Sequence, residues 1–366
     1  MLSLFITLIS YPFGGGEDFL YQCMHWCTDK NIKVVWISFL DKFRQEHKKF
    51  LVRKTEHGYI VDLPGGFKES TLREWIKLIK PDFINTQGFE MTKIVKVAEE
   101  FAIPVICGFH FWIDLVDLNA ASYNKDIIEN IDKHKISPNF SIIKNSPIAF
   151  PYVCSEFVRD VVKKLDDIEM PVIYPSSGSE KIKLNMKPWF NQYILQINIH
   201  KLKGGEILEK IITANPDLPY ICIQTEPCSE DLDNRIKNLL NSDSRLLGHT
   251  ENMVEIYAQT RIMLAPSIVD ETFCRTVCEA MANGIPIITT GKGNISNLVG
   301  DSAIILNEND DWGTAVVNLY TNPDLLKQYS ERTKRRYKLF SENVAKAQFS
   351  NLFYQVNQRS EEHTSE

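Results

Sequence analysis

The sequence lacks the features that mark several large classes of protein. Its 366 residues carry 41 Lys and Arg against 47 Asp and Glu, so it has no basic excess of the kind that nucleic-acid binding requires. The apolar start Met1–Ser10 stops at Tyr11-Pro12, far short of the ~20 residues that span a bilayer, and it has no basic beginning like that of a signal peptide. We therefore expect a cytoplasmic protein with no nucleic-acid partner, in which this segment is a buried strand.

Common metal and dinucleotide fingerprints are also missing. The 8 cysteines include no Cys-x-x-Cys pair and lie mostly in apolar runs, which predicts buried, reduced thiols and no metal site. Gly14-Gly15-Gly16 does not have the G-x-G-x-x-G spacing of dinucleotide-binding proteins. We recognise no Asp-x-Asp pair of the kind that holds a metal-bound diphosphate, since Asp310 and Asp311 are adjacent. No metal and no cofactor is expected.

What the sequence does have is a repeated alternation of short apolar runs and amphipathic stretches. With 44% hydrophobic and 24% charged residues, the chain has the balance of a globular protein that can bury two cores. Segments such as Asp18–Lys30 and Met91–Phe101 have helical spacing. The predicted strands are Met1–Ile9, Ile32–Phe39, Phe83–Thr86, Pro104–Gly108 and Ala149–Cys154, then Tyr193–Asn198, Tyr220–Gln224, Arg261–Ala265, Pro286–Thr289 and Ala303–Leu306. Strand and helix in repetition predict an α/β protein with parallel sheets.

The pattern breaks once, in the Pro-, Ser- and Lys-rich stretch Tyr174–Pro188, which predicts a linker between two similar domains. We place these domains at 1–175 and 176–335, with a ligand cleft at the carboxyl ends of the strands. Residues 336–358 are expected to form a C-terminal helix, and 359–366 (RSEEHTSE) read as a non-native tail resembling a translated sequencing adapter. The polar stretch 119–147 is expected to be a surface helix with loops.

The strongest functional signal is Asp270–Pro286, with the sequence DETFCRTVCEAMANGIP. A helix is predicted to begin near Thr272 and to end at Gly284, which suits the left-handed C-terminal position. The amides of Phe273, Cys274 and Arg275 would then lie in its first turn and form a phosphate site. Glu271 and Glu279, separated by about 12 Å of helix at most, could accept hydrogen bonds from the sugar and ribose hydroxyls of a sugar nucleotide.

The second signal is Asn198–Gly205, NIHKLKGG, which follows a predicted strand. It places Lys203 beside Gly204, where a long cation next to flexible backbone can neutralise a diphosphate leaving group. A solvated loop lysine is the alternative interpretation of Lys203 taken alone.

Two further signals lie in the first half of the chain. Gly15 and Gly16 stand between a strand and a helix, where glycine lets a ligand approach the backbone closely and leaves helix amides open. His110, in the aromatic run CGFHFW, follows another strand. A single histidine among aromatic residues is also compatible with simple packing.

Taken together, these motifs resemble the donor motif of the family 4 retaining glycosyltransferases, which have the GT-B fold of two Rossmann-like domains facing each other across a cleft. The segments that agree are Leu247-Gly248, Asn252-Met253, Ile256-Tyr257-Ala258 and Ala265-Pro266-Ser267. The resemblance implies that Glu271 contacts the transferred sugar, Glu279 the ribose and Lys203 the leaving phosphate. It also implies that the glycine loop at Gly15-Gly16 faces the donor phosphates and the acceptor, and that His110 lies near the transferred sugar.

The resemblance also implies the reaction and its partners. A sugar would move, with retention, from a UDP- or GDP-type sugar nucleotide to the hydroxyl of a glycan, lipid or small-molecule acceptor, and no metal would be needed. Asn198 stands where the family usually has arginine, for which His200 and Lys201 could compensate, and Cys274 stands in place of the usual glycine. These departures favour the alternative of a nucleotide-sugar-binding protein with a decayed site. A sugar-nucleotide epimerase on the same fold is a further alternative.

A basic cluster in 327–338 contains Lys334, Arg335, Arg336 and Lys338. We interpret it as a solvated helix face. The alternative is peripheral contact with an anionic membrane surface.

Overall fold

The computed structural model describes residues 1–9, 15–40, 49–88, 90–117, 134–176, 182–224, 230–248, 250 and 252–364. These residues divide into two compact units. The first contains the described residues up to 176 and the C-terminal segment from Asn343 on, and the second contains those from 182 to Glu342. The division falls within the stretch that the sequence predicts as a linker, and the chain returns to the first unit near its end.

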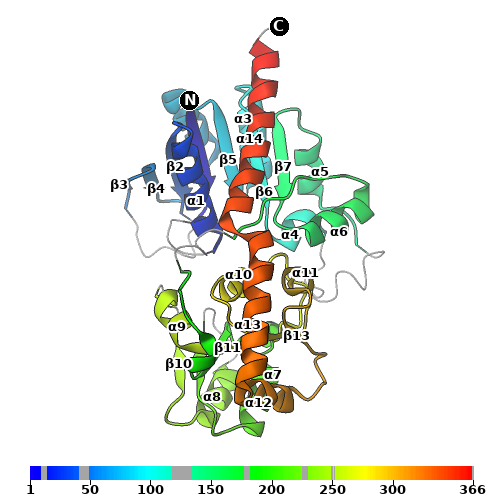
Figure 1. Ribbon diagram of the computed structural model, residues 1–366. Helices are drawn as coiled ribbons and strands as arrows, with labels where there is room; N and C mark the ends of the chain where they lie inside the picture. Colours follow the sequence, from blue (N-terminus) through cyan, green and yellow to red (C-terminus); the bar gives the residue numbers. More distant parts are fainter. Residues whose placement is uncertain are drawn as a thin grey trace. The chain divides into compact units, whose positions relative to one another are not determined.

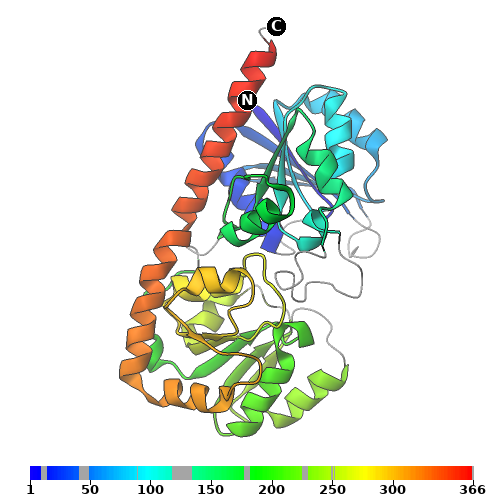
Figure 2. The same cartoon turned by 90° about the vertical axis from the view of Figure 1, so that its right-hand side faces the viewer.

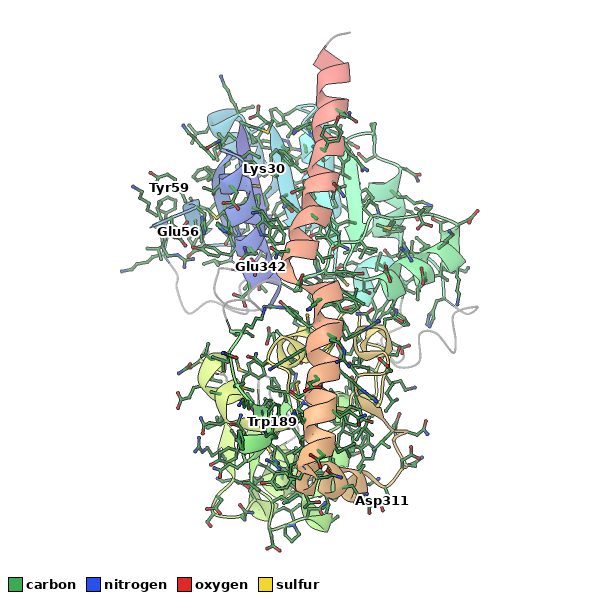
Figure 3. All side chains as sticks on the ribbon, viewed as in Figure 1. Lys30, Glu56, Tyr59, Trp189, Asp311 and Glu342 are labelled. Atoms are coloured by element: carbon green, nitrogen blue, oxygen red, sulfur yellow. The ribbon has the colours of Figure 1, made fainter. Side chains whose placement is uncertain are left out.

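The first unit is built on a seven-stranded sheet in the order β3-β4-β2-β1-β5-β6-β7. All neighbours pair parallel except β3, which is antiparallel to β4. Glu56, in the turn between these two strands, points outward at the sheet edge (Figure 3). The strands are β1 (Leu2–Thr7), β2 (Lys33–Phe39), β3 (Leu51–Thr55), β4 (Gly58–Leu63), β5 (Phe83–Gln87), β6 (Val105–Phe109) and β7 (Ala149–Val153).

Helices cover both faces of this sheet (Figure 2). They are α1 (Gly15–Asp29), α2 (Glu69–Ile79), α3 (Met91–Glu99), α4 (Trp112–Leu115), α5 (Pro138–Lys144), α6 (Glu156–Asp166) and α14 (Glu342–Thr364). Helix α14 packs beside α1 and against the sheet through aromatic rings (Figure 1). The ring centroid of Phe349 lies 5.6 Å from that of Trp26 on α1, and that of Phe353 lies 5.0 Å from that of Phe83 on β5. The burial of such rings accounts for the return of the C-terminal segment to the first unit.

The second unit has a six-stranded parallel sheet in the order β10-β9-β8-β11-β12-β13. Its strands are β8 (Tyr193–Ile197), β9 (Tyr220–Ile223), β10 (Arg245–Leu247), β11 (Thr260–Ala265), β12 (Ile287–Thr289) and β13 (Ile304–Ile305). Its helices are α7 (Gly205–Ala214), α8 (Glu230–Leu239), α9 (Met253–Gln259), α10 (Arg275–Ala282), α11 (Asn294–Val299), α12 (Trp312–Thr321) and α13 (Pro323–Tyr337), with short 3₁₀ turns at Pro188–Phe190, Lys201–Lys203 and Lys338–Phe340.

The parallel α/β architecture expected from the sequence is confirmed, and three strands were missed. The exposed hairpin β3–β4 lies at one sheet edge, where β3 buries little and so carries no apolar run. Strand β10 has three residues and is also an edge strand. The seven described cysteines are free thiols, six of them buried, as the sequence predicts.

In each sheet there is one point where the direction in which successive strands are added to the sheet reverses. In the first unit β1 lies between β2 and β5, and in the second β8 lies between β9 and β11. The connections after the two central strands leave in opposite directions there and open a crevice outside the carboxyl ends, the usual ligand site of an open α/β sheet. The loops that follow β1, β5, β8 and β11 are therefore the first places to look for function.

Candidate functional site

The loop after β8 positions Lys203. Asn198 begins it in the left-handed region, with φ 61°, a conformation that Asn adopts more readily than most residues. His200 then caps a 3₁₀ turn, its Nδ1 accepting from the Leu202 amide at 3.1 Å. Gly204 closes the turn with φ 82°, and a Cβ there would lie 2.1 Å from the Pro266 carbonyl oxygen. The glycine thus lets this loop pack directly on the loop after β11.

The loop after β11 positions Glu271. Its backbone forms a parallel bridge with Gly293, and the Asn294 amide donates to the Glu271 carbonyl oxygen at 2.8 Å. Gly293 has φ 61°, and a Cβ there would lie 2.3 Å from the Glu271 nitrogen. The buried Asn294 side chain donates to the Phe273 carbonyl oxygen at 3.2 Å. Two backbone contacts and one side chain therefore fix the approach to α10.

Lys203 and Glu271 meet where the two loops touch. Lys203 Nζ lies 2.5 Å from Glu271 Oε1, which also accepts from Ser267 Oγ at 3.0 Å. The Glu271 side chain is 13% exposed and that of Lys203 35%, so the pair lies at the edge of the solvent rather than in the core. A cation and a carboxylate are thus held adjacent at the crossover of the second sheet.

Helix α10 begins later than the sequence predicts. Its first residue is Arg275, not Thr272, because Cys274 adopts φ 70° and breaks the helical conformation before it. The first-turn amides are therefore those of Arg275, Thr276 and Val277, and the predicted amide donors Phe273 and Cys274 lie before the helix. The expected end is confirmed, since Gly284 has φ 64° after the last helical residue Ala282.

Glu279 lies one turn into α10, on the same face as Arg275. Tyr257 from α9 donates its hydroxyl to Glu279 Oε2 at 2.7 Å, and Arg275 lies 3.5 Å from Oε1. Burial, followed by the negative charge of Glu279, raises the pKa of Tyr257 well above its usual value, so the phenol remains a donor. The Glu279 carboxylate is 14% exposed and is held in one orientation.

A cavity of about 260 Å³ lies at this crossover. Five of the predicted site residues line it: Asn198, Lys203, Glu271, Cys274 and Arg275. Ser267 and Thr276 also face it, whereas the buried Phe273 is not part of its lining. Gly204 is not part of the lining, but its close contact with Pro266 holds the two loops of the cavity together. Most of the residues predicted in the second unit thus meet at this cavity, whereas Glu279 is not part of its lining.

Cys274 supplies a neutral thiol to this cavity. Burial, followed by the nearby Glu271 charge, raises its pKa to about 12 against the opposing effect of Lys203. At neutral pH the thiolate is negligible, so Cys274 is not poised as a nucleophile. Its side chain occupies space that a glycine would leave open.

The other predicted residues lie in the first unit. Gly15 and Gly16 form the start of α1, and Gly16 lies against the side chain of Gln87 at the end of β5. His110 is 9% exposed, with Nε2 3.2 Å from the Tyr152 hydroxyl and its ring 5.4 Å from that of Phe19. His110 is thus a packed, hydrogen-bonded side chain at the carboxyl end of β6.

The two residues expected to compensate for Asn198 are engaged locally. His200 Nδ1 accepts from the Leu202 amide, and Lys201 pairs with Glu206 at 3.0 Å with a 63% exposed side chain. Neither lines the cavity of the second unit.

An Asp-x-Asp spacing does occur in the chain, contrary to the sequence reading, at Asp231 and Asp233. Both lie on α8, where side chains two apart point in different directions. Asp231 pairs with Arg235, and Asp233 accepts from Gln224. In the described part of the chain, no group of three or more His, Cys, Asp or Glu side chains is arranged to hold a metal ion.

Two side chains of the basic cluster on α13 form hydrogen bonds within the second unit. Lys334 Nζ donates to the Met186 carbonyl oxygen at 3.3 Å, and its aliphatic stem packs on Gly284. Arg336 donates to the carbonyl oxygens of Asn297 and Leu298. The membrane interpretation stays a prediction, and none of the described helices is both long and apolar enough to cross a bilayer.

Comparison with known proteins agrees with this geometry. Residues 206–322 match the family model described as glycosyl transferases group 1. N-acetyl-alpha-D-glucosaminyl L-malate synthase of Bacillus anthracis is 26% identical over 243 residues, which cover 63% of this chain and 60% of the relative, less than two thirds of its length.

Solved structures align over nearly the whole chain. Sucrose-phosphate synthase of Thermosynechococcus elongatus aligns with TM-score 0.72 and 13% identity, covering 98% of this chain and 100% of the other. Anabaena HepE in complex with UDP aligns with TM-score 0.69 and 14% identity over 97% and 100%. A glycosyltransferase of Rickettsia africae aligns with TM-score 0.71 and 15% identity over 97% and 98%.

Two parallel α/β units of this kind define a GT-B protein, and the structural likeness shows that fold. Within the second unit, residues 206–322 are similar to the glycosyl transferases group 1.

Four residues that shape the site received no role from the sequence: Tyr257, Ser267, Gly293 and Asn294. Tyr257 and Ser267 stand in segments that agree with the glycosyltransferase family, so the sequence did carry a signal for these two residues. Gly293 and Asn294 lie in a loop whose contact with Glu271 depends on tertiary structure, and local pattern gives no sign of it.

Proposed function

We propose that this protein is a retaining glycosyltransferase that takes a sugar from a nucleotide-diphosphate donor and transfers it to a hydroxyl acceptor. The observation that carries the proposal is the contact between Lys203 and Glu271 at the start of α10. In such a donor the sugar is bonded directly to a phosphate. Groups that recognise the sugar and the phosphate must therefore be neighbours, as this carboxylate and this cation are.

The order of groups along the site matches the order of groups in the donor. Glu271 precedes the first turn of α10, whose amides and partial positive charge suit a diphosphate. Glu279 follows the start of the helix by four residues, about 6 Å along its axis, toward the place of a ribose. Sugar, diphosphate and ribose would thus be met in sequence by Glu271, Lys203 with the first-turn amides, and Glu279.

Lys203 and the helix start would stabilise the charge that develops on the departing phosphate. With Cys274 protonated, we propose a front-face reaction without an enzymic nucleophile. The acceptor oxygen bonds to the anomeric carbon on the face from which the nucleotide leaves. The bond from that carbon to the phosphate oxygen breaks, and this oxygen takes the acceptor proton. The configuration of the anomeric carbon is retained, which proton NMR of the product checks directly.

For the donor we propose a UDP-sugar first and a GDP-sugar second. The support is that solved structures of the same fold contain UDP or UDP-glucose. The sugar-transferring relative from Bacillus anthracis is compatible with a small-molecule acceptor, beside a glycan or a lipid. We propose that no metal takes part, because Lys203 and the helix start already supply positive charge to the diphosphate.

Calorimetric titration of the full chain with UDP, GDP and ADP in EDTA tests the donor site. We expect one nucleotide to bind without metal, and Glu279→Ala to abolish that binding because the ribose loses a charge-assisted acceptor. As a control, Glu331→Ala makes the same substitution at an exposed position of α13 and should leave the nucleotide affinity unchanged.

Unchanged affinity in Glu279→Ala contradicts the ribose assignment. Binding without turnover of any sugar nucleotide favours the alternative of a binding protein with a decayed site, which the neutral Asn198 and the Cys274 side chain support.

A further inference from the structure

A carboxamide lies in the apolar core of the second sheet. Gln196 is part of β8 and is 1% exposed. The strand register places it between Cys222 on β9 and Leu264 on β11, both of which are buried. Gln196 Oε1 has no hydrogen-bond partner in the described part of the protein. Because a buried acceptor without a donor destabilises a fold, an apolar residue would suit this position better, which points to a role for the other end of the side chain.

The other end of this carboxamide holds the loop that carries Lys203. Gln196 Nε2 donates to the Lys203 carbonyl oxygen at 3.2 Å. The preceding residue, Leu202, is held from a different side, since the Ile268 amide in the loop after β11 donates to its carbonyl oxygen at 3.1 Å. The following residue, Gly204, packs on that same loop. Gln196 therefore joins the Lys203 peptide to β8, between two contacts that join its neighbours to the loop after β11.

The place of the Lys203 ammonium depends on this peptide. Lys203 Nζ lies 2.5 Å from Glu271 Oε1, and both residues line the cavity. The lysine side chain is 35% exposed, and its stem is long and flexible. A fixed backbone is therefore needed, beside the ion pair, to keep the ammonium in one place. Without the bond from Gln196, the Lys203 peptide could turn and move the ammonium away from Glu271.

We infer that Gln196 is a positioning residue of the donor site, which fixes the Lys203 peptide to β8 and thereby holds the Lys203 ammonium beside Glu271. The part of the inference that concerns the departing phosphate rests on the proposed function, whereas the link from Gln196 to Lys203 does not. The unused Oε1 would then be the cost in stability of placing a donor beneath this loop.

Gln196→Met is the variant that separates position from stability. Methionine has nearly the length and shape of glutamine, but it has no donor for the Lys203 carbonyl oxygen and no buried Oε1. The two losses oppose each other in stability, so the urea midpoint should equal or exceed that of the parent. Gln196→Leu is a second variant with the same expectation. Gln259→Met is the matched control, because the Gln259 carboxamide also donates to a backbone carbonyl oxygen, that of Glu255 at 3.0 Å, and does not line the cavity.

The experiment uses the full chain with lysine labelled with ¹³C at Cε, and Lys203→Arg assigns the Lys203 signal by its loss. We expect Gln196→Met to shift this signal and Gln259→Met to leave it in place. With the sugar nucleotide whose base calorimetry identifies, kcat of Gln196→Met should fall roughly tenfold through misplacement of the ammonium. KM should change less than kcat, because the charge on the phosphate grows during the reaction.

Three results would overturn the inference. The first is an unmoved Lys203 signal in Gln196→Met and Gln196→Leu, which with a lowered urea midpoint would assign Gln196 to the core alone. The second is an equal shift in Gln259→Met, and the third is a shifted signal with parental kcat. If no sugar nucleotide is turned over by the parent, the proposed function fails, and the Lys203 signal still decides whether Gln196 positions Lys203.

Discussion

Each sheet reverses its growth at one point, between β1 and β5 in the first unit and between β8 and β11 in the second. In the second unit, both site carboxylates are paired: Glu271 with Lys203 and Ser267, and Glu279 with Tyr257 and Arg275. Buried polar atoms without a hydrogen-bond partner occur among the described residues of both units: Gln87 Oε1 and Asp114 Oδ2 in the first, and Gln196 Oε1 and Arg275 Nε in the second. What distinguishes the second crevice is its charge, because Glu271 and Glu279 are held there by contacts within the unit.

The charge of the second crevice suits a charged ligand. Charged groups need fixed partners in advance, because unpaired buried charge is costly and misplaced charge loses its effect on a transition state. The four predictions below test this contrast, and they run from the largest expected effect to the smallest.

Lys203→Ala should lower kcat by roughly 10²–10³, because it removes the cation that stabilises charge on the departing phosphate. Nucleotide affinity should fall less than kcat, since the charge grows during the reaction. Steady-state kinetics with the sugar nucleotide found by calorimetry give both values. Lys201→Ala is the control, because Lys201 is exposed and pairs with Glu206. Equal losses in the two variants would mean that only the general charge of the loop matters.

Gly293→Ala should destabilise the second unit by about 3 kcal/mol, since its Cβ would collide with the Glu271 backbone and its positive φ disfavours alanine. The change should also abolish nucleotide binding by shifting Glu271. Urea unfolding with calorimetry on the same samples measures both effects. Gly248→Ala meets no atom within 4 Å and serves as control. A Gly293→Ala protein of parental stability would show that the bridge to Glu271 is loose.

Asp114→Asn should stabilise the protein at pH 7 by about 2 kcal/mol. Burial raises the pKa of Asp114 to about 6 from 3.8. The folded state then holds this proton to higher pH than the unfolded chain, so stability falls as pH rises from about 4 to about 6. The gain from Asn should therefore shrink toward pH 4. Urea unfolding across pH 4–7 checks this, with the exposed Asp117→Asn as control. A gain that does not vary with pH would contradict burial as the cause.

Tyr257→Phe should weaken nucleotide binding roughly fivefold, the effect of one hydrogen bond that orients Glu279. The ring stays in its buried place, so the unfolding free energy should change by no more than about 1 kcal/mol. Calorimetry with the bound nucleotide and urea unfolding separate the two. A large loss of stability with unchanged affinity would assign Tyr257 to the core alone.

Much of the fold followed from the sequence, because buried parallel strands appear as continuous apolar runs such as those that became β1, β8 and β11. Glu271 and Lys203 could be predicted to meet because they lie in compact local patterns at the ends of those strands. The start of α10 was wrong by three residues, because Cys274 adopts a left-handed backbone that its residue type does not favour. The contacts of Gly293 and Gln87 are made with neighbours far away in the chain, which no local pattern records.

The left-handed backbone at Asn198 also limits how this loop can be redesigned. Arginine at 198 would bring a second cation to the loop, but it would have to adopt φ near 61°, at a cost of about 1–2 kcal/mol for a side chain that cannot relieve it locally as Asn does. An arginine at 198 would therefore be better tolerated if the turn that follows β8 were reshaped with it. The charge of the pocket is thus coupled to the path of its main chain, and a redesign gains from changing both together.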